Sequence, residues 1–436
     1  MMKSLLRGAG LFLLLVVFLV AWIVLPWQAL LGIAVLFALW MAFTRSGRQA
    51  ASVTRVGVST LTQRLGASSV VVVGIAGVVG VLVALLAMAE GYRHTVSSSG
   101  SDDTAIVLRG GSSAELMSVL SRDQLNAIER APEIARDAEG RPMASAELVV
   151  SANVPRLDGE DGSVTLRGID AMAWAVRPNV KLVEGRKFEP GRRELVVGKG
   201  ARRQFAGLDP GKEVRLGNQV WTVVGAFESG DGMESEMWAD GEIVASAYRR
   251  GSSRASVFAK LTDPAAFKAF KATLAADPRL QVEADTTREY FSKQSEGITT
   301  VLRWIGIIVG SIMAVGAVFG ALNTMFATVA SRAREIATLR AIGFRGMPVV
   351  VAVMLETMLL AAIGGLLGGL LAWLIFNGYT ASTVAGGVAS LSFEFKVSPA
   401  LLWQGLKWAL AIGFVGGLFP ALRAATLPVT TALRAA

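Results

Sequence analysis

The chain contains no cysteine and only one histidine, His94, among its 436 residues. Without cysteine it can form neither a disulfide nor a thiolate metal site. A single histidine supplies neither a catalytic triad nor a histidine-based metal centre. No G-x-x-x-x-G-K-[ST] sequence occurs, so this chain does not bind ATP through a P-loop. We therefore expect a protein that is not an enzyme and that carries no cofactor and no metal of its own.

Acidic residues are scarce outside residues 91–300. That segment holds 30 of the 34 Asp and Glu and 28 of the 43 Lys and Arg, which leaves 4 acidic and 15 basic residues elsewhere. The excess basic residues border long apolar runs, where Lys and Arg mark cytoplasmic loops and meet anionic headgroups. The net charge of +9 therefore does not indicate a nucleic-acid partner.

Apolar runs long enough to cross a bilayer recur along the chain, and 53% of all residues are hydrophobic. These runs predict a polytopic α-helical membrane protein with about six spans and a large α+β extracytoplasmic domain inserted between spans three and four. The predicted parts are a two-helix hairpin (1–45), an interfacial helix (46–66), span three (67–90), the α+β domain (91–300), span four (301–330), a cytoplasmic segment (331–348), span five (349–377), a periplasmic loop (378–400), span six (401–422) and a cytoplasmic tail (423–436).

The N-terminal hairpin is predicted from one uncharged stretch, Gly8–Thr44. A single helix of that length would be about 55 Å long, whereas the apolar core of a bilayer is about 30 Å thick. Pro26 divides the stretch into two runs, which favours a hairpin with a turn at Pro26-Trp27. The alternative is a signal peptide, because Lys3 and Arg7 precede the first run.

The charge of the loops predicts the topology. The segments placed in the cytoplasm carry twelve Lys and Arg and a single acidic residue, Glu335. An even number of spans then puts both termini in the cytoplasm and the large domain outside.

The polar insert alternates short strand-like and helix-like segments. Strands are expected at Thr104–Arg109 and Glu194–Gly198, and a hairpin over Glu213–Phe227 with its turn at Gly217-Asn218. A helix is expected over Ser121–Ala131, begun by a capping box of Ser121 and Gln124. We expect an α+β subdomain that carries a mostly-β subdomain over about 160–250.

The segment Ser331–Arg345, SRAREIATLRAIGFR, is a short basic stretch between two long apolar runs. Ile336, Leu339 and Ile342 recur at three-residue steps, and Gly343 can end a helix. The segment therefore predicts a small amphipathic helix at the inner membrane face, which a soluble partner could grip.

This segment resembles the coupling helix of the MacB/FtsX-like ABC transporter permeases, the type VII or mechanotransmission type. Residues 322–344, Glu356 with the IGGLLGG that follows it, and the close GLFPALRAATLPVTTALR at 417–434 resemble the family's permease region. Residues 183–200 and 214–227 resemble its periplasmic core. The hairpin over 1–44 departs from the family's four-span layout.

The resemblance implies a homodimeric permease in the inner membrane, with its large domain in the periplasm. Two copies of a separate cytoplasmic ABC ATPase would bind it and would hold ATP and Mg. Membrane lipids and a periplasmic or outer-membrane protein are further expected partners. The residues expected to contact the ATPase are Arg332, Arg334, Glu335, Ile336, Leu339, Arg340, Ile342 and Gly343.

Two other functions fit the same layout. The chain could be a membrane-anchored receptor or scaffold that regulates a periplasmic partner, such as a cell-wall hydrolase, without transport. It could also be an ion-coupled exporter that uses Glu356, which lies inside span five. The competing interpretation of Glu356 is a structural partner for arginines of the basic segment. The cargo stays open among lipoproteins, peptides, macrolide-like drugs and lipids.

Overall fold

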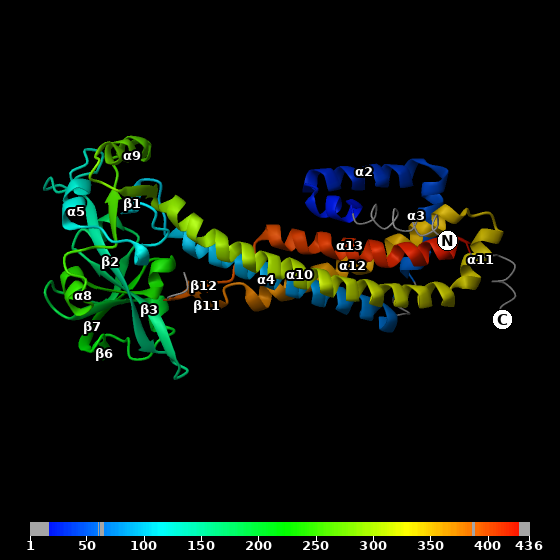
Figure 1. Ribbon diagram of the computed structural model, residues 1–436. Coiled ribbons are helices and arrows are strands. Elements are labelled where there is room, and N and C mark those ends of the chain that lie inside the picture. The colour runs from blue at the N-terminus through cyan, green and yellow to red at the C-terminus, as the bar shows by residue number, and fades with distance from the viewer. Residues whose placement is uncertain (1–16, 60, 62–64, 386–388, 427–436) are drawn as a thin grey trace, which may run out of the picture. The chain divides into compact units, whose positions relative to one another are not determined.

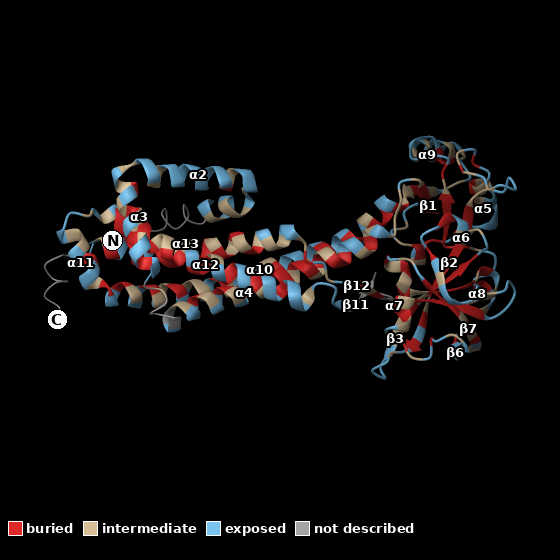
Figure 2. Cartoon of the chain, turned by 180° about the vertical axis from the view of Figure 1, so that it is seen from behind, coloured by how far each residue is buried: buried red, intermediate tan, exposed pale blue. Residues whose placement is uncertain are grey.

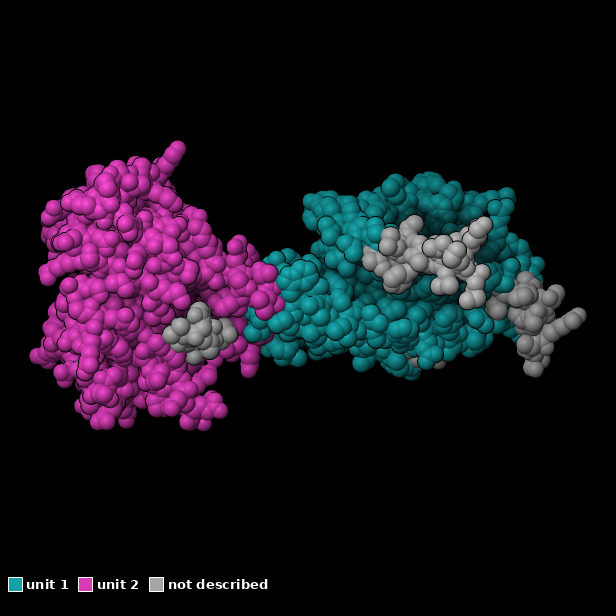
Figure 3. All heavy atoms as spheres, in the orientation of Figure 1, with its two compact units in different colours: residues 1–88, 302–377, 396–436 teal, residues 89–301, 378–395 magenta. Residues whose placement is uncertain are grey.

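A computed structural model describes residues 17–59, 61, 65–385 and 389–426. The chain divides into two compact units, which Figure 3 colours separately. One comprises residues 1–88, 302–377 and 396–436 and is called the helical unit here. The other comprises residues 89–301 and 378–395 and is called the sheet unit.

The helical unit is built from long apolar helices, labelled in Figure 1. Four of the described helices are long and apolar enough to cross a membrane: α4 (Leu65–Ser98), α10 (Thr287–Ser331), α12 (Gly346–Phe376) and α13 (Pro399–Thr426). The first two also contribute residues to the sheet unit. Between α10 and α12 lies the short helix α11 (Ala333–Ala341), and α3 (Arg45–Ser59) precedes α4.

Glycines bring the membrane helices into close contact. A Cβ added at Gly368 of α12 would lie 2.3 Å from the carbonyl oxygen of Ala76 in α4. One added at Gly413 of α13 would lie 2.4 Å from the Cβ of Ala361 in α12. Neither position accepts a side chain without moving a helix. Small residues at such crossings let the backbones approach, so van der Waals packing can hold helices together in lipid.

The N-terminal stretch forms two helices, Val17–Val24 and α2 (Trp27–Phe43), which are bent by 112° at the break around Pro26. By length and composition this pair counts as at most one span, so the described residues show four or five candidate spans. The expected total of six is not confirmed. Figure 2 shows α2 largely exposed, and Leu30 is its one buried residue.

The first helix of this bent pair is attached to α13. The indole nitrogen of Trp22 donates to the carbonyl oxygen of Lys407 over 3.2 Å. The ammonium of Lys407, which is itself buried, donates to the carbonyl oxygen of Ile23. The rings of Phe18 and Phe414 lie 5.3 Å apart. Two reciprocal hydrogen bonds and a ring contact therefore hold residues 18–23 against α13.

The sheet unit contains one ten-stranded sheet in the order β10-β1-β9-β2-β3-β8-β5-β7-β4, with β6 paired to β7. Its strands are β1 (Thr104–Arg109), β2 (Ala144–Pro155), β3 (Asp161–Ile169), β4 (Lys181–Gly185), β5 (Glu194–Gly198), β6 (Glu213–Leu216), β7 (Gln219–Glu228), β8 (Glu236–Asp240), β9 (Ser256–Lys260) and β10 (Val282–Thr286). The helices of this unit include α5 (Arg122–Glu129), α6 (Ala173–Val176), α7 (Lys199–Arg202), α8 (Gly241–Ala247) and α9 (Phe267–Ala276).

Two separate apolar cores support this sheet. The first core packs β1, β9 and β10 with α5 and α9 around Ile128 and Phe270. The second packs β2, β3, β5, β7 and β8 with α8 around Leu166 and Trp221. The second core begins at Leu148 on β2, before the expected range of about 160–250, and its strands continue the sheet of the first.

Local sequence signals set several of these elements. The Ser121 hydroxyl accepts from the Gln124 backbone and the Gln124 side chain accepts from Ser121 N–H, so the predicted capping box is confirmed. Gly217 and Asn218 both have positive φ, at 54° and 65°, in the turn that pairs Leu216 with Gln219. That conformation is typical of a two-residue hairpin and confirms the predicted turn.

One predicted loop is a hairpin instead. Residues after Gly378 form β11 (Thr380–Ala385) and β12 (Ala389–Glu394), paired antiparallel. Phe393 is buried, with its ring 5.6 Å from that of Tyr92, and Ser392 N–H donates to the Ser235 hydroxyl over 2.9 Å. This region was expected to be a loop because it is polar and rich in Gly. Packing against the rest of the sheet unit stabilises two strands here instead.

Candidate functional site

Helix α11 is the centre of the candidate site. It begins after Arg332, whose backbone is non-helical at φ −101° and ψ 8°, and this residue separates it from α10. At its end, Gly343 N–H donates to the Arg340 carbonyl and Phe344 N–H to the Leu339 carbonyl, over 3.2 and 3.1 Å. With Gly343 at φ +103°, this is a Schellman ending. The predicted helix and its glycine stop are therefore confirmed.

An ion pair fixes the start of α11 to α12. The Arg332 Nη1 donates to Glu356 Oε2 over 2.9 Å, and its Nε donates to Glu335 Oε2 over 3.1 Å. Arg332 is 9% exposed and Glu356 is 3% exposed. The two buried charges compensate each other, and Glu335 gives Arg332 a second partner.

Helix α3 closes over this pair. Its buried face consists of Gly47, Ala50, Val53 and Gly57, spaced three or four residues apart as expected for one side of a helix. A Cβ added at Gly57 would lie 3.2 Å from Glu356 Oε2, so a larger residue here would require the ion pair to shift by a few tenths of an ångström. Sequence reasoning did not single out Gly57. The available signal was its place on the stripe that Gly47, Ala50 and Val53 form.

Ile336, Leu339 and Ile342 differ in burial. Ile336 is 6% exposed and packs with Met325, Val349 and Ala421, whereas Ile342 is 69% exposed. Leu339 is partly exposed and lines a groove. Ile342 is the C-cap, where the chain already leaves the helical path.

The outward surface of the segment is both charged and apolar. Arg334, Glu335 and Thr338 are exposed along α11, as are Ile342 at its C-cap and Met347 in the first turn of α12. Met347 is 61% exposed and was not among the expected contact residues. Arg340 is partly exposed. A partner that grips this segment from solution would reach these side chains first, while Arg332 and Ile336 hold the helix from within.

An apolar groove of about 420 Å³ lies between α3, α11 and α12. Val53 of α3, Leu339 of α11, and Val349 and Val353 of α12 line it, with the Arg332–Glu356 pair also in its wall. The groove places the buried ion pair next to space that a neighbouring apolar group could enter.

Within residues 17–59, 61, 65–385 and 389–426, no group of three or more His, Asp or Glu is placed to hold a metal ion. His94 is exposed on α4, as expected for a surface residue rather than a ligand.

Two family models match the chain: the MacB-like periplasmic core domain over residues 68–277 and the FtsX-like permease C-terminal domain over residues 307–429. The macrolide export ATP-binding/permease protein MacB of Shewanella oneidensis is 24% identical over 375 residues, 76% of this chain and 55% of that protein. The pyoverdine export ATP-binding/permease protein PvdT of Pseudomonas aeruginosa is 25% identical over 382 residues, 83% of this chain and 55% of that protein.

The chain thus spans about half the length of these two relatives. Among solved structures, the periplasmic region of MacB from Actinobacillus actinomycetemcomitans is similar over 46% of this chain and 95% of that one. The sequence identity is 16% and the TM-score is 0.35.

Proposed function

Because this chain belongs to the MacB/FtsX-like family of ABC transporter permeases, we propose that it couples ATP hydrolysis to movement of its sheet unit. In this proposal a separate cytoplasmic ABC ATPase dimer binds the segment around α11 and supplies ATP and Mg. The chain lies in the inner membrane with both termini in the cytoplasm and the sheet unit in the periplasm. The movement serves export or extraction of a substrate, or mechanical signalling to a periplasmic or outer-membrane partner.

The observation that carries this proposal is that the α11 segment has one buried side attached to the helical unit and one exposed side. Arg332 joins the segment to α12 through Glu356, and Ile336 is packed in an apolar cluster. Arg334, Ile342 and Met347 are exposed. When a helix is fixed on one side and exposed on the other, a force applied to its exposed side is transmitted to the elements that hold it. Since α10 and α12 flank α11 directly in sequence, a force on α11 reaches both spans.

The exposed face of α10 supports the proposal of a second copy of this chain as partner. Gly306 and Gly310 of this helix contact Leu85 and Leu82 of α4, within the chain. Gly316 and Gly320 repeat the same spacing but have no heavy atom within 4 Å of an added Cβ. Small residues four apart favour close association of membrane helices.

The test is affinity purification of the full chain in mild detergent, followed by measurement of ATP hydrolysis in the product. The variant is Arg334→Glu with Ile342→Asp, which changes only exposed side chains. The control is Arg48→Glu, which reverses an exposed charge on α3. We expect an ATPase to co-purify with the native chain and with the control but not with the variant.

Two outcomes would contradict the proposal. Retention of the ATPase by the double variant would show that the α11 segment is not its binding site. Purification of the native chain alone, without nucleotide hydrolysis, would favour the membrane-anchored receptor or scaffold.

A further inference from the structure

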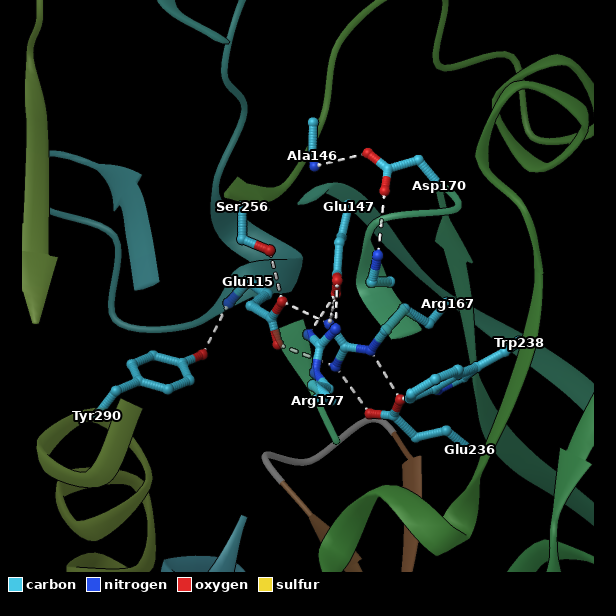
Figure 4. Close-up of polar contacts among 11 residues, drawn as sticks. Glu115, Ala146, Glu147, Arg167, Asp170, Arg177, Glu236, Trp238, Ser256 and Tyr290 are labelled. Carbon is cyan, nitrogen blue, oxygen red and sulfur yellow. Dashed lines mark hydrogen bonds and ion pairs between the residues drawn. The ribbon is translucent and has the colours of Figure 1, made fainter. Parts of the chain in front are cut away.

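A buried charge cluster lies at the centre of the sheet, and Arg167 of β3 is its hub (Figure 4). The Arg167 Nε and Nη2 donate to Glu236 over 2.7 Å each. Its Nη1 and Nη2 donate to Glu115 over 2.8 and 3.1 Å, and Nη1 also donates to Glu147 over 2.9 Å. All five N–H groups of the guanidinium are therefore used.

The carboxylates around Arg167 have further partners of their own. Arg177 donates to both oxygens of Glu147, over 2.5 and 2.8 Å. The Ser256 hydroxyl donates to Glu115 over 2.6 Å, and the Trp238 indole donates to Glu236 over 2.9 Å. Three carboxylates and two guanidinium groups thus form one connected network. Arg167 is 2% exposed and Glu147 is fully buried.

The members of this cluster come from both apolar cores. Ser256 lies on β9, a strand of the first core, and Glu115 lies in the turn Glu115–Met117 that follows β1. Arg167 on β3 and Glu236 on β8 belong to strands of the second core. The cluster therefore occupies the junction where the two apolar cores meet, and polar bonds replace apolar packing there.

The cluster also contacts the first turn of α10. The Tyr290 hydroxyl accepts from the backbone N–H of Glu115 over 3.2 Å and from Gln294 Nε2 over 2.6 Å. Three residues earlier, the Thr287 hydroxyl exchanges hydrogen bonds with the backbone of Ser101, over 2.8 and 3.0 Å. The sheet-unit end of α10 is thereby tied to the same turn that supplies Glu115 to Arg167.

A charged junction behaves differently from an apolar one. Apolar surfaces can slide with little change in energy, whereas a hydrogen bond weakens steeply when its length or angle changes. Rotation of one core against the other would lengthen several of the Arg167 bonds together, and would leave buried charges unpaired. The cluster therefore adds to the pairing of β2 with β9 and β3 in holding the two cores in one relative orientation.

We propose that the Arg167 cluster and Tyr290 form a rigid joint that makes both cores of the sheet unit follow α10 as one body. Arg167 and Tyr290 are positioning residues in this joint. The inference deepens the proposed function, on which its physiological meaning rests, because movement of α10 would then reach the whole sheet unit without loss at the junction.

The test measures distances in the full chain, in detergent, without ATPase or nucleotide. The lack of cysteine allows spin labels to be placed at chosen pairs of introduced cysteines. The pair Lys268→Cys and Arg215→Cys reports the first core against the second, and Glu296→Cys with Arg215→Cys reports α10 against the second core. Lys268, Arg215 and Glu296 are exposed. We expect one narrow distance distribution for each pair.

In Arg167→Met, we expect the distance distribution of the Lys268–Arg215 pair to broaden and to lose its single narrow peak. The control is Arg186→Met, because Arg186 is half exposed and makes a two-bond pair with Glu194 of β5, over 2.7 Å each, without contacting the cluster. Tyr290→Phe should broaden only the Glu296–Arg215 pair. If Arg167→Met does not fold, Glu236→Gln removes one carboxylate charge at nearly constant volume and should broaden the first pair.

A narrow distribution in folded Arg167→Met or Glu236→Gln, or a broad one in the native chain, would overturn the proposal. So would equal broadening in Arg186→Met, or a Glu296–Arg215 distribution that stays narrow in Tyr290→Phe. These results are independent of whether an ATPase binds α11, so failure of this inference is distinguishable from failure of the proposed function.

Discussion

Buried ionic contacts join elements of this protein at places where apolar packing is interrupted. In the helical unit Arg332 pairs with Glu356 beside Gly57. In the sheet unit Arg167 collects three carboxylates. Buried pairs add little net stability over apolar substitutes, but removal of one partner leaves a charge that neither water nor protein compensates. Both sites should therefore respond differently to single and to paired substitutions.

For the α11 segment, Arg332→Met or Glu356→Met alone should destabilise the chain by up to roughly 3–5 kcal/mol, because each removes the buried partner that compensates the other charge. The double variant should recover most of this loss. Thermal unfolding of the four proteins in detergent, evaluated as a double-mutant cycle, measures the interaction directly. Additive losses would show that the two residues do not stabilise each other.

The same pair separates coupling from ion transport. If Glu356 is a structural partner, Glu356→Gln should weaken assembly and ATP-driven activity together, since the amide replaces only part of a charged hydrogen bond. An ion-coupled exporter would instead lose transport with its assembly intact. Measurement of ATPase co-purification and transport on one preparation distinguishes these results.

The sheet unit should lose stability in acid. Burial raises the pKa of Glu115, but the nearby Arg167 guanidinium lowers it further, so its net pKa lies below the ordinary value. A carboxyl with a depressed folded pKa contributes stability that is fully present above its unfolded pKa of about 4.3, and is lost as pH falls through the folded pKa. Urea unfolding of the full chain from pH 7 to pH 3, followed by tryptophan fluorescence, should show falling midpoints. A flat profile below pH 4 would contradict the role of this carboxylate.

At the scale of elements, α10 carries two glycine pairs with different surroundings. Gly310 is closed in by Leu82, at 2.8 Å from an added Cβ, while Gly316 and Gly320 are open. The sequence presents these glycines as equivalent small-residue faces. Only the packing of α4 on α10 shows which pair is already used within the chain.

Gly316→Ile with Gly320→Ile should leave the monomer folded and reduce its self-association, because bulky side chains keep a second α10 at a distance. Gly310→Ile should destabilise the fold instead, since it collides with Leu82. Cysteine crosslinking at Ile312, which is 69% exposed on α10, reports association on a cysteine-free background. Unchanged crosslinking in the Gly316 and Gly320 variant would exclude this face as the dimer contact.

At the scale of the whole molecule, the topology depends on how the N-terminal bent pair lies in the membrane. Positive residues favour a cytoplasmic location for α3 and α11, and the sheet unit then lies outside. If the bent pair crosses twice or not at all, the N-terminus is also cytoplasmic. If it crosses once, the N-terminus is outside.

Single cysteines should reveal which arrangement holds. We expect Ser113→Cys in the sheet unit to react with a membrane-impermeant maleimide in cells whose outer membrane is permeabilised. Ser52→Cys in α3 and Ser4→Cys near the N-terminus should react only after lysis. Labelling of Ser4→Cys from outside, with Ser52→Cys still protected, would show a single crossing and would correct the predicted placement of the N-terminus.

Features that depend on local chemistry could be predicted from the amino-acid sequence. Apolar length marked the four long spans, Ser121 with Gln124 marked a helix start, and Gly343 marked the end of α11. Each of these depends on a few neighbouring residues, whose preferences survive in any context. The basic segment with its flanking spans was also specific enough to indicate the family.

Which side chains contact each other depends on how elements that are distant in sequence pack together. Glu115, Glu147, Arg167 and Glu236 are spread over more than a hundred residues, and no spacing rule predicts that three carboxylates share one guanidinium. The same holds for Gly57 beside Glu356 and for the contact of Lys407 with Ile23. These contacts arise from the packing of strands and helices that are distant in sequence. A buried ionic or polar group is unfavourable without a partner, and this requirement comes from burial and not from local propensity.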